Sequence, residues 1–280
     1  MSRPRGGGRR LLLIALALVT GCAGETDGSA VKSPADATSS NRAAARPAPP
    51  GESLAADDGC LQSGERPVHF PAQDGSPLAG VLVGRGTTAV IAAHMVTSNA
   101  CEWLPFARRL AARKVLVLAY DTRGDGVSPS GLDISRVDLD MPGAVAFLRG
   151  RGVTRIVLAG ASAGGTDALV AAATVSPPVD GVVALSAATV IGHQADAAAT
   201  APRLAAPTLI MAAAGDASSP DDARTIYAAT ASRDKKLSIV PGSSHGTHLL
   251  DDPTYGHVYA DQVEAWILSH LAARGVNQRP

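Results

Sequence analysis

The sequence predicts an α/β fold built on a mostly parallel sheet with helices on both faces. Eight short apolar runs, several of them rich in β-branched residues, alternate over most of the chain with longer segments of helical character. Parallel strands need a crossover connection, which a helix commonly supplies, so this alternation favours parallel pairing. With 280 residues and 46% hydrophobic content, the chain can build one sizeable core.

The order of strands and helices follows from the apolar runs and the segments between them. Strands are expected at residues 66–70, 77–84, 89–94, 115–120, 155–160, 181–186, 207–213 and 236–240. Helices are expected at residues 103–113, 140–150, 163–174, 220–231 and 255–273. Pro142 in one helix, and the two acidic residues after Pro220 in another, fit a first helical turn. No helix separates the first two strands, so they should pair antiparallel at one edge of the sheet.

The composition gives no sign of nucleic-acid binding, and an apparent cofactor-binding motif lacks the structural context that it needs. Lys and Arg together number 25, as do Asp and Glu, so no basic excess indicates nucleic-acid binding. Residues 84–89 fit the dinucleotide fingerprint G-x-G-x-x-A, but a strand follows them where that motif requires a helix. We therefore expect a turn there and no cofactor. Neither Cys60 nor Cys101 has a second Cys or a His at ligand spacing, so no metal site is expected either.

Residues 1–21 have the pattern of a signal peptide. Basic residues ending at Arg10 precede an apolar run at residues 11–19 that is too short to span a bilayer as a helix. Residues 19–22, Val-Thr-Gly-Cys, resemble the lipobox of bacterial lipoproteins, which implies cleavage before Cys22 and lipidation of its thiol. A protein of this kind is exported and anchored by lipid on the outer side of the cell membrane. An ordinary secretory signal peptide stays open as the alternative.

The residues after the signal peptide divide into a tether and one folded domain. Residues 22–58 are rich in Ala, Ser, Pro, Gly and Asp and contain almost no large apolar side chain, so we expect a disordered tether. Residues 59–280 are expected to form the domain. With Cys22 lipidated, Cys60 and Cys101 remain as an even pair in an exported protein, which predicts a disulfide.

Three side chains at strand ends carry the pattern of a nucleophilic triad. Ser162 lies within Gly-Ala-Ser-Ala-Gly, residues 160–164, between an expected strand and an expected helix. A sharp turn in that position lifts a serine hydroxyl above the sheet, where a base and an acid must activate it. Asp216 and His245 follow the next strands in the required order of nucleophile, acid and base.

Other residues near these positions keep alternatives open. Asp221 or Asp222 could supply the acid, with Asp216 as a turn residue, and His248 could replace His245 as the base.

On these motifs, residues 66–273 resemble the α/β-hydrolase superfamily, and the compact chain is similar to dienelactone hydrolases. Asp216 lies four residues before Pro220, and His245 precedes a glycine, as is common in that superfamily. The resemblance implies the α/β-hydrolase fold, with Ser162 as nucleophile, Asp216 as acid and His245 as base. Serine at the turn departs from dienelactone hydrolases, which carry cysteine there.

The resemblance also implies an activity and an oxyanion site. Hydrolysis of a small-molecule carboxylic ester through an acyl-enzyme is the expected reaction. A thioesterase, an amidase and an inactive surface-binding lipoprotein are the alternatives. The backbone N–H groups of Ala163 and Met95 are the expected oxyanion donors. Residues 188–206 are too few for a large cap domain, and "YDTRGDGVS", residues 120–128, resembles a structural turn of the same superfamily.

Overall fold

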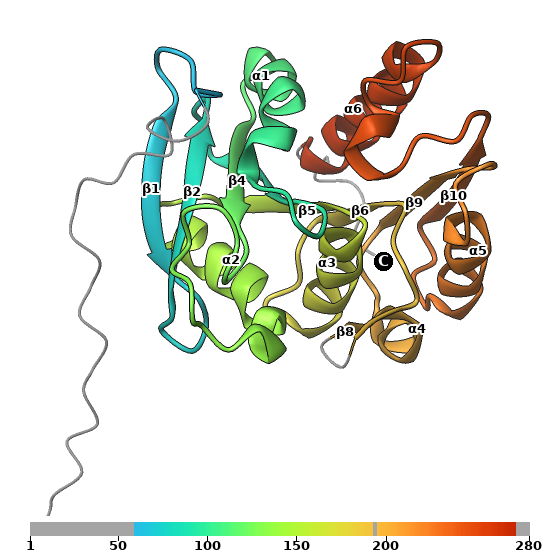
Figure 1. Ribbon diagram of the computed structural model, residues 1–280, viewed down its shortest axis with the longest axis horizontal. Coiled ribbons are helices and arrows are strands. Elements are labelled where there is room, and N and C mark those ends of the chain that lie inside the picture. The colour runs from blue at the N-terminus through green and yellow to red at the C-terminus, as the bar shows by residue number, and fades with distance from the viewer. Residues whose placement is uncertain (1–58, 193–194, 273–280) are drawn as a thin grey trace, which may run out of the picture. The chain divides into compact units, whose positions relative to one another are not determined.

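The computed structural model describes residues 59–192 and 195–272, and an eight-stranded sheet forms its centre (Figure 1). The strands are β1 Arg66–Pro71, β2 Pro77–Val83, β3 Thr88–Ala93, β4 Leu116–Asp121, β5 Arg155–Ala161, β6 Gly181–Leu185, β9 Thr208–Ala213 and β10 Lys235–Val240. Their order in the sheet is β1-β2-β4-β3-β5-β6-β9-β10. β2 pairs antiparallel with β1 and β4, and all other pairs are parallel. The expected fold class and the antiparallel edge are therefore confirmed.

Helices cover both faces of this sheet (Figure 1). The helices are α1 Leu104–Ala112, α2 Asp140–Gly150, α3 Ala163–Thr174, α5 Ser219–Ala229 and α6 Gly256–Leu271, as the sequence predicts to within a few residues. Buried side chains of α1 and α6 form one apolar core with one face of the sheet, and those of α2, α3 and α5 form a second core with the other face. β5 and β3 lie centrally, so side chains at their carboxyl ends are held by a sheet that is buried on both sides.

The described connection between β6 and β9 is short. It forms a two-stranded hairpin of β7 Val190–Ile191 and β8 Ala195–Asp196, then α4 Ala197–Thr200 and the 3-10 turn η4 Ala201–Arg203. No large cap domain is present in this connection, as expected. The hairpin was not predicted, because strands of two residues are too short to show a periodic pattern.

Two expectations about local structure are also confirmed. Residues 84–87 form a turn that leads into β3, with positive φ at Gly84 (77°) and Gly86 (150°), and no helix begins there. Cys60 is bonded to Cys101, with sulfur atoms 2.01 Å apart. The bond ties the start of the described chain to η2, the 3-10 helix Ala100–Trp103 that precedes α1. The expected signal peptide, Cys22 and the tether lie outside the described residues.

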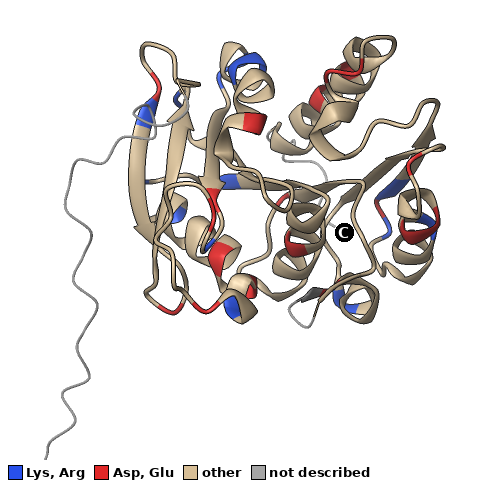
Figure 2. Cartoon of the chain, viewed as in Figure 1, with Lys and Arg blue, Asp and Glu red and all other residues tan. Residues whose placement is uncertain are grey.

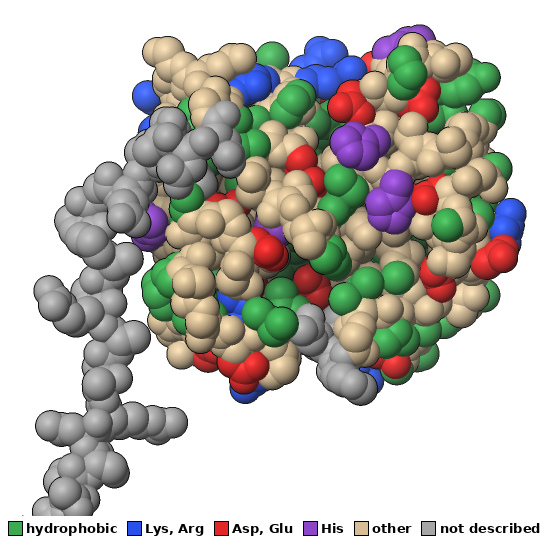
Figure 3. Space-filling model, viewed as in Figure 1, with side chains coloured by type: hydrophobic (Ala, Val, Ile, Leu, Met, Phe, Trp, Pro, Cys, Tyr) green, Lys and Arg blue, Asp and Glu red, His purple; other side chains and the backbone are tan. Residues whose placement is uncertain are grey.

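Charges are mixed over the described part of the chain. Figure 2 shows basic and acidic residues scattered over helices and loops. On the face drawn in Figure 3, they lie among hydrophobic side chains. Within residues 59–192 and 195–272, no group of three or more His, Cys, Asp or Glu side chains is arranged to hold a metal ion. None of the helices described is long and apolar enough to span a membrane.

Candidate active site

Ser162 lies at a sharp turn between β5 and α3. Its backbone has φ 51° and ψ −117°, a conformation that residues other than glycine rarely adopt. The Ser162 N–H donates to the carbonyl of Leu185 at 2.8 Å, so the end of β6 helps to hold the turn. We refer to this turn, residues 160–164, as the elbow.

The small residues of the elbow are required by close backbone contacts. A Cβ atom at Gly160 would overlap the carbonyl of Gly164 in the first turn of α3. A Cβ atom at Gly164 would overlap the carbonyls of Ala93 and His94 at the end of β3. The helix can therefore begin directly against the sheet only with glycine at both positions.

Asp216 and His245 contact each other at the carboxyl ends of β9 and β10. The imidazole Nδ1 lies 3.0 Å from Asp216 Oδ1 and 2.9 Å from Oδ2. The Asp216 side chain is 7% exposed, whereas that of His245 is 42% exposed. This bond fixes the ring through Nδ1 and leaves Nε2 without a partner among the described residues.

The alternative acids and base are engaged elsewhere. Asp221 pairs with Arg224 at 2.7 Å, and Asp222 accepts a hydrogen bond from the Thr189 hydroxyl at 2.9 Å. His248 is exposed and lies 3.7 Å from Asp251. Of the residues considered, the structure brings together only Asp216 and His245.

Ser186, at the carboxyl end of β6, joins the acid to the histidine loop. Its hydroxyl donates to Asp216 Oδ2 at 2.7 Å and accepts from the Gly246 N–H at 3.0 Å. Ser186 is not among the residues predicted for the site, although its place at the end of an expected strand was a signal for it. The loop it binds also reaches the elbow, because a Cβ atom at Gly246 would lie 3.3 Å from that of Ala161.

The N–H group of Met95 does not serve the role expected for it. This N–H donates to Glu102 Oε1 at 2.8 Å and is therefore not free to bind an oxyanion. The carboxylate comes from η2, and its Oε2 atom is buried without a partner among the described residues. The expectation for Met95 is thus corrected, because a tertiary contact turns its peptide group toward η2.

His94 also fixes this loop. Its Nε2 accepts from the Thr122 N–H at 3.1 Å, so Nδ1 carries the proton and donates to the Met95 carbonyl at 2.6 Å. His94 is 2% exposed, and its ring links the loop after β3 to the loop after β4. Each ring nitrogen of His94 thus has a hydrogen-bond partner, which indicates a structural role.

A cavity of about 460 Å³ lies beside the elbow, and we call it the elbow cavity. Its lining combines the loops after β3 and β4 with the first turns of α3 and the hairpin at β7. Lining residues include Val96, Arg123, Ile134, Ala163, Asp167 and Ile191. A larger cavity of about 970 Å³ is formed by α2 and the loops near Pro71 and Pro177, and no residue of the elbow lines it.

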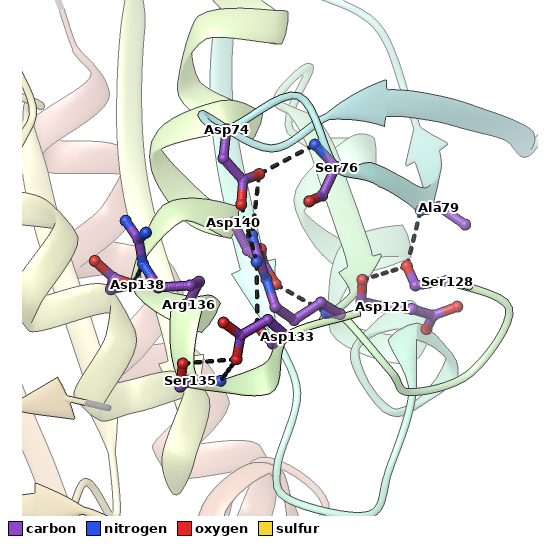
Figure 4. Close-up of polar contacts among 11 residues, drawn as sticks. Asp74, Ser76, Ala79, Asp121, Ser128, Asp133, Ser135, Arg136, Asp138 and Asp140 are labelled. Carbon is purple, nitrogen blue, oxygen red and sulfur yellow. Dashed lines mark hydrogen bonds and ion pairs between the residues drawn. The ribbon is translucent and has the colours of Figure 1, made fainter. Parts of the chain in front are cut away.

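The turn at residues 120–128 is structural. Its Ser128 hydroxyl donates to the Asp121 carbonyl at 2.7 Å and accepts from the Ala79 N–H at 3.0 Å (Figure 4). The buried Asp121 carboxylate accepts from the Ala100 N–H at 2.7 Å, so the turn also holds η2.

Arg123 in the same turn is buried between two carboxylates. Its guanidinium bonds Asp140 at 2.7 Å and Asp74 at 3.1 Å, two residues that lie close together in Figure 4. Burial raises the pKa of Asp140 to about 6, although its bonds to Arg123 oppose the shift.

The central part of the chain matches one family model. Residues 85–198 match the model described as serine aminopeptidase, S33, which is less than half of the chain. A comparison with curated protein sequences gives no match.

Solved structures of hydrolases are similar to this chain. A thermophilic esterase from Thermogutta terrifontis has a TM-score of 0.61 at 15% identity, covering 73% of this chain and 99% of that chain. An esterase from Pyrococcus furiosus has a TM-score of 0.61 at 16% identity, covering 73% and 92%. Dienelactone hydrolase from Anabaena variabilis has a TM-score of 0.61 at 23% identity, covering 75% and 99%. The chain has the α/β-hydrolase fold, and the family match with these neighbours supports a serine hydrolase of that type.

Proposed function

We propose that the protein hydrolyses carboxylic esters of small molecules through an acyl-enzyme on Ser162. The observation that carries this proposal is the hydrogen bond between Asp216 and His245, together with the packing of the His245 loop against the elbow of Ser162 through Gly246. A hydroxyl at a strained strand-to-helix turn, with an oriented imidazole in a neighbouring loop, is the arrangement that acyl transfer requires.

The reaction has two steps, acylation of Ser162 and hydrolysis of the acyl-enzyme, and His245 is the base in both. His245 Nε2 takes the Ser162 proton as Oγ attacks the ester carbonyl, and Asp216 stabilises the imidazolium through Nδ1. The C–O bond to the leaving alcohol then breaks, and His245 returns the proton to that alcohol. Water attacks the acyl-enzyme by the same steps in reverse, which releases the carboxylic acid and restores Ser162.

The oxyanion of each tetrahedral intermediate needs two N–H donors. The Ala163 N–H is the first, because it opens α3 and no described residue accepts its hydrogen bond. With Met95 bound to Glu102, we assign the second donor to Val96, the next residue in the loop. Val96 and Ala163 line the same cavity, and no described acceptor engages the Val96 N–H.

An amide substrate is the second candidate. The matching family model is described as a serine aminopeptidase, and the acyl-enzyme route accepts an amine leaving group if the base protonates it. Parallel assays of an ester and the corresponding amide decide between the two.

A fluorophosphonate probe tests the proposed nucleophile. The wild-type protein should be labelled, and peptide mapping should locate the label on Ser162, whereas Ser162→Ala should not react. Folded wild-type protein that stays unlabelled and cleaves no ester would indicate a binding protein on a hydrolase scaffold. Labelling at another serine would also contradict the proposal.

We further propose that the protein is exported and anchored to the membrane by lipid on Cys22. The proposal depends on the lipobox-like residues 19–22 and the preceding signal-peptide pattern. Cys22→Ala should move the protein from the membrane fraction to the soluble fraction. Membrane association that persists in this variant would contradict the lipid anchor.

A further inference from the structure

Asp167 is a buried carboxyl group in the wall of the elbow cavity that the proposed mechanism does not use. It lies on α3, five residues after Ser162, and is 6% exposed. Among the described residues, no group donates a hydrogen bond to its carboxyl and no basic side chain pairs with it. A carboxyl of this kind is costly to bury unless it acquires a partner, which a bound ligand can supply.

The position of Asp167 on α3 directs its side chain toward the elbow. Asp167 and Ala163 are four residues apart, so they share one face of the helix at a separation of about 6 Å along its axis. Side chains on a helix lean toward its N-terminus, so the carboxyl lies over the turn that contains Ala163. A group that extends from an acyl carbon on Ser162 into the cavity would meet this carboxyl.

The groups around Asp167 make this end of the cavity acidic. Burial, followed by the charges of Asp140 and Asp138, raises the pKa of Asp167 to about 7. Arg123 also lines the cavity, but Asp140 and Asp74 already neutralise its charge.

Two more polar groups complete these surroundings. Asp125 lines the cavity and accepts a hydrogen bond from the Thr122 hydroxyl at 2.9 Å. The buried Tyr120 hydroxyl, whose pKa is raised by burial and by the charges of Asp140 and Asp167, has no partner among the described residues. The charge in this wall that no neighbouring side chain neutralises is therefore negative, which favours the binding of a cation.

Part of the wall is aliphatic. Ile134, Val137 and Ile191 line the cavity beside Asp167, and Ile134 is 59% exposed. Aliphatic side chains in this position suit the methylene groups of an acyl chain, whose burial is favourable. The wall thus combines a surface for a short aliphatic chain with the unpaired carboxyl of Asp167.

We propose that Asp167 is a specificity-determining residue that binds a protonated amine carried by the acyl chain of the substrate. This inference depends on the proposed function, because it places the acyl group of the Ser162 acyl-enzyme in the elbow cavity. The substrate class is accordingly an ester of a short amino acid whose amine lies on the acyl chain beyond the carbonyl, rather than an ester of a plain fatty acid.

Ethyl 3-aminopropanoate and ethyl butanoate provide a matched test, because their acyl chains have the same number of heavy atoms. We expect the wild-type protein to hydrolyse the amine-bearing ester with a kcat/KM at least about tenfold higher, the effect of one charge-assisted contact. Asp167→Asn should abolish this preference. Asp138→Asn removes a nearby charge outside the cavity lining and should keep the preference within about threefold of wild type.

The pH dependence of the preference gives a second readout. The ratio of the two kcat/KM values cancels the titration of the catalytic groups that both esters share. It should rise between pH 6 and 8, as Asp167 ionises while the amine of the ester stays protonated. Ethyl 3-hydroxypropanoate separates charge from hydrogen bonding, and an equal gain with this ester would overturn the assignment to an amine.

The outcomes distinguish this inference from the proposed function. Hydrolysis of ethyl butanoate without preference for the amine, or a preference that survives in Asp167→Asn, overturns the role of Asp167 alone. Failure to cleave any ester, with no fluorophosphonate labelling, overturns the proposed function. If Asp167→Asn does not fold, as judged by its thermal melt, Asp167→Ser provides the second variant for the same comparison.

Discussion

The Ser186 hydroxyl donates a 2.7 Å hydrogen bond to the Asp216 carboxylate and accepts one from the Gly246 N–H. The carboxylate is thereby held from two sides, by Ser186 and by the His245 ring. A hydroxyl at the end of β6 thus couples the acid loop to the histidine loop. This arrangement gives the acid a defined orientation without a second charge.

Asp216→Asn should lower kcat about 10⁴-fold, because an amide favours the wrong tautomer of the histidine. Asp222→Asn is the matched control, since Asp222 lies in the first turn of α5, six residues after Asp216, and its carboxylate bonds Thr189 rather than His245. Steady-state kinetics with a short-chain ester measure both variants. Equal losses in the two variants would show that general charge, rather than the His245 contact, matters.

Ser162→Gly should abolish hydrolysis and raise the free energy of unfolding by about 1 kcal/mol, because glycine adopts φ 51° without strain. Ser162→Ala should also be inactive but should melt within about 1 °C of wild type, since alanine keeps the strained backbone. Thermal melts of the three proteins make the comparison. A glycine variant that melts no higher than the alanine variant would contradict stored strain at the elbow.

Glu102→Ala should lower kcat by about 10- to 100-fold with little change in KM, because the loop after β3 loses the acceptor that orients Met95. Glu102→Gln keeps an oxygen acceptor and should retain most of the activity. Glu102 is a positioning residue in this view, as it does not contact the reacting atoms. An alanine variant with wild-type kcat would show that the Met95 contact has no influence on the oxyanion site.

Most of the fold was predictable from the sequence, because its strands and helices carry local patterns. Apolar runs such as residues 155–160 are long enough to be recognised, and the glycine pair around Ser162 reports a close backbone contact. The β7–β8 hairpin has no such pattern. Its strands are stabilised by tertiary context rather than by their own composition.

The site was predictable only in part, for a different physical reason. Asp216 and His245 follow strands whose ends must meet at one edge of a parallel sheet, so their contact could be expected. The direction of a peptide N–H cannot be read in this way. The Met95 N–H was wrongly expected to bind the oxyanion, because Glu102 in η2, seven residues later, accepts its hydrogen bond.

Reduction of the Cys60–Cys101 disulfide should lower the melting temperature by about 10 °C, since a bond that closes a loop of this length contributes about 4 kcal/mol. The double variant with serine at both positions should melt like the reduced protein. Non-reducing peptide mapping should recover Cys60 joined to Cys101. Free thiols at both positions in protein purified without a reductant would contradict the pairing.

Asp167→Asn should stabilise the protein increasingly as the pH rises from about 4 to about 7. Burial raises the pKa of Asp167 from 3.8 to about 7, so between these values the folded protein holds a proton that the unfolded chain has lost. The free energy of unfolding of the wild type therefore decreases as the pH rises through this window. Asparagine cannot ionise, so the variant lacks the contribution of Asp167 to this decrease. Above pH 7 both states are ionised and the difference should stay constant.

Chemical denaturation at pH 4, 5.5, 7 and 8 measures this difference in free energy of unfolding. Asp140 also titrates near pH 6 close to Asp167, and it is present in both proteins, so the subtraction largely removes its contribution. Asp138→Asn serves as the control for charge near the cavity, because the Asp138 side chain is 35% exposed. This variant removes only the smallest of the three causes of the Asp167 shift, so its stability difference should change much less with pH than that of Asp167→Asn. A stability difference for Asp167→Asn that is flat from pH 4 to 8 would mean that Asp167 ionises as readily in the folded protein as in the unfolded chain.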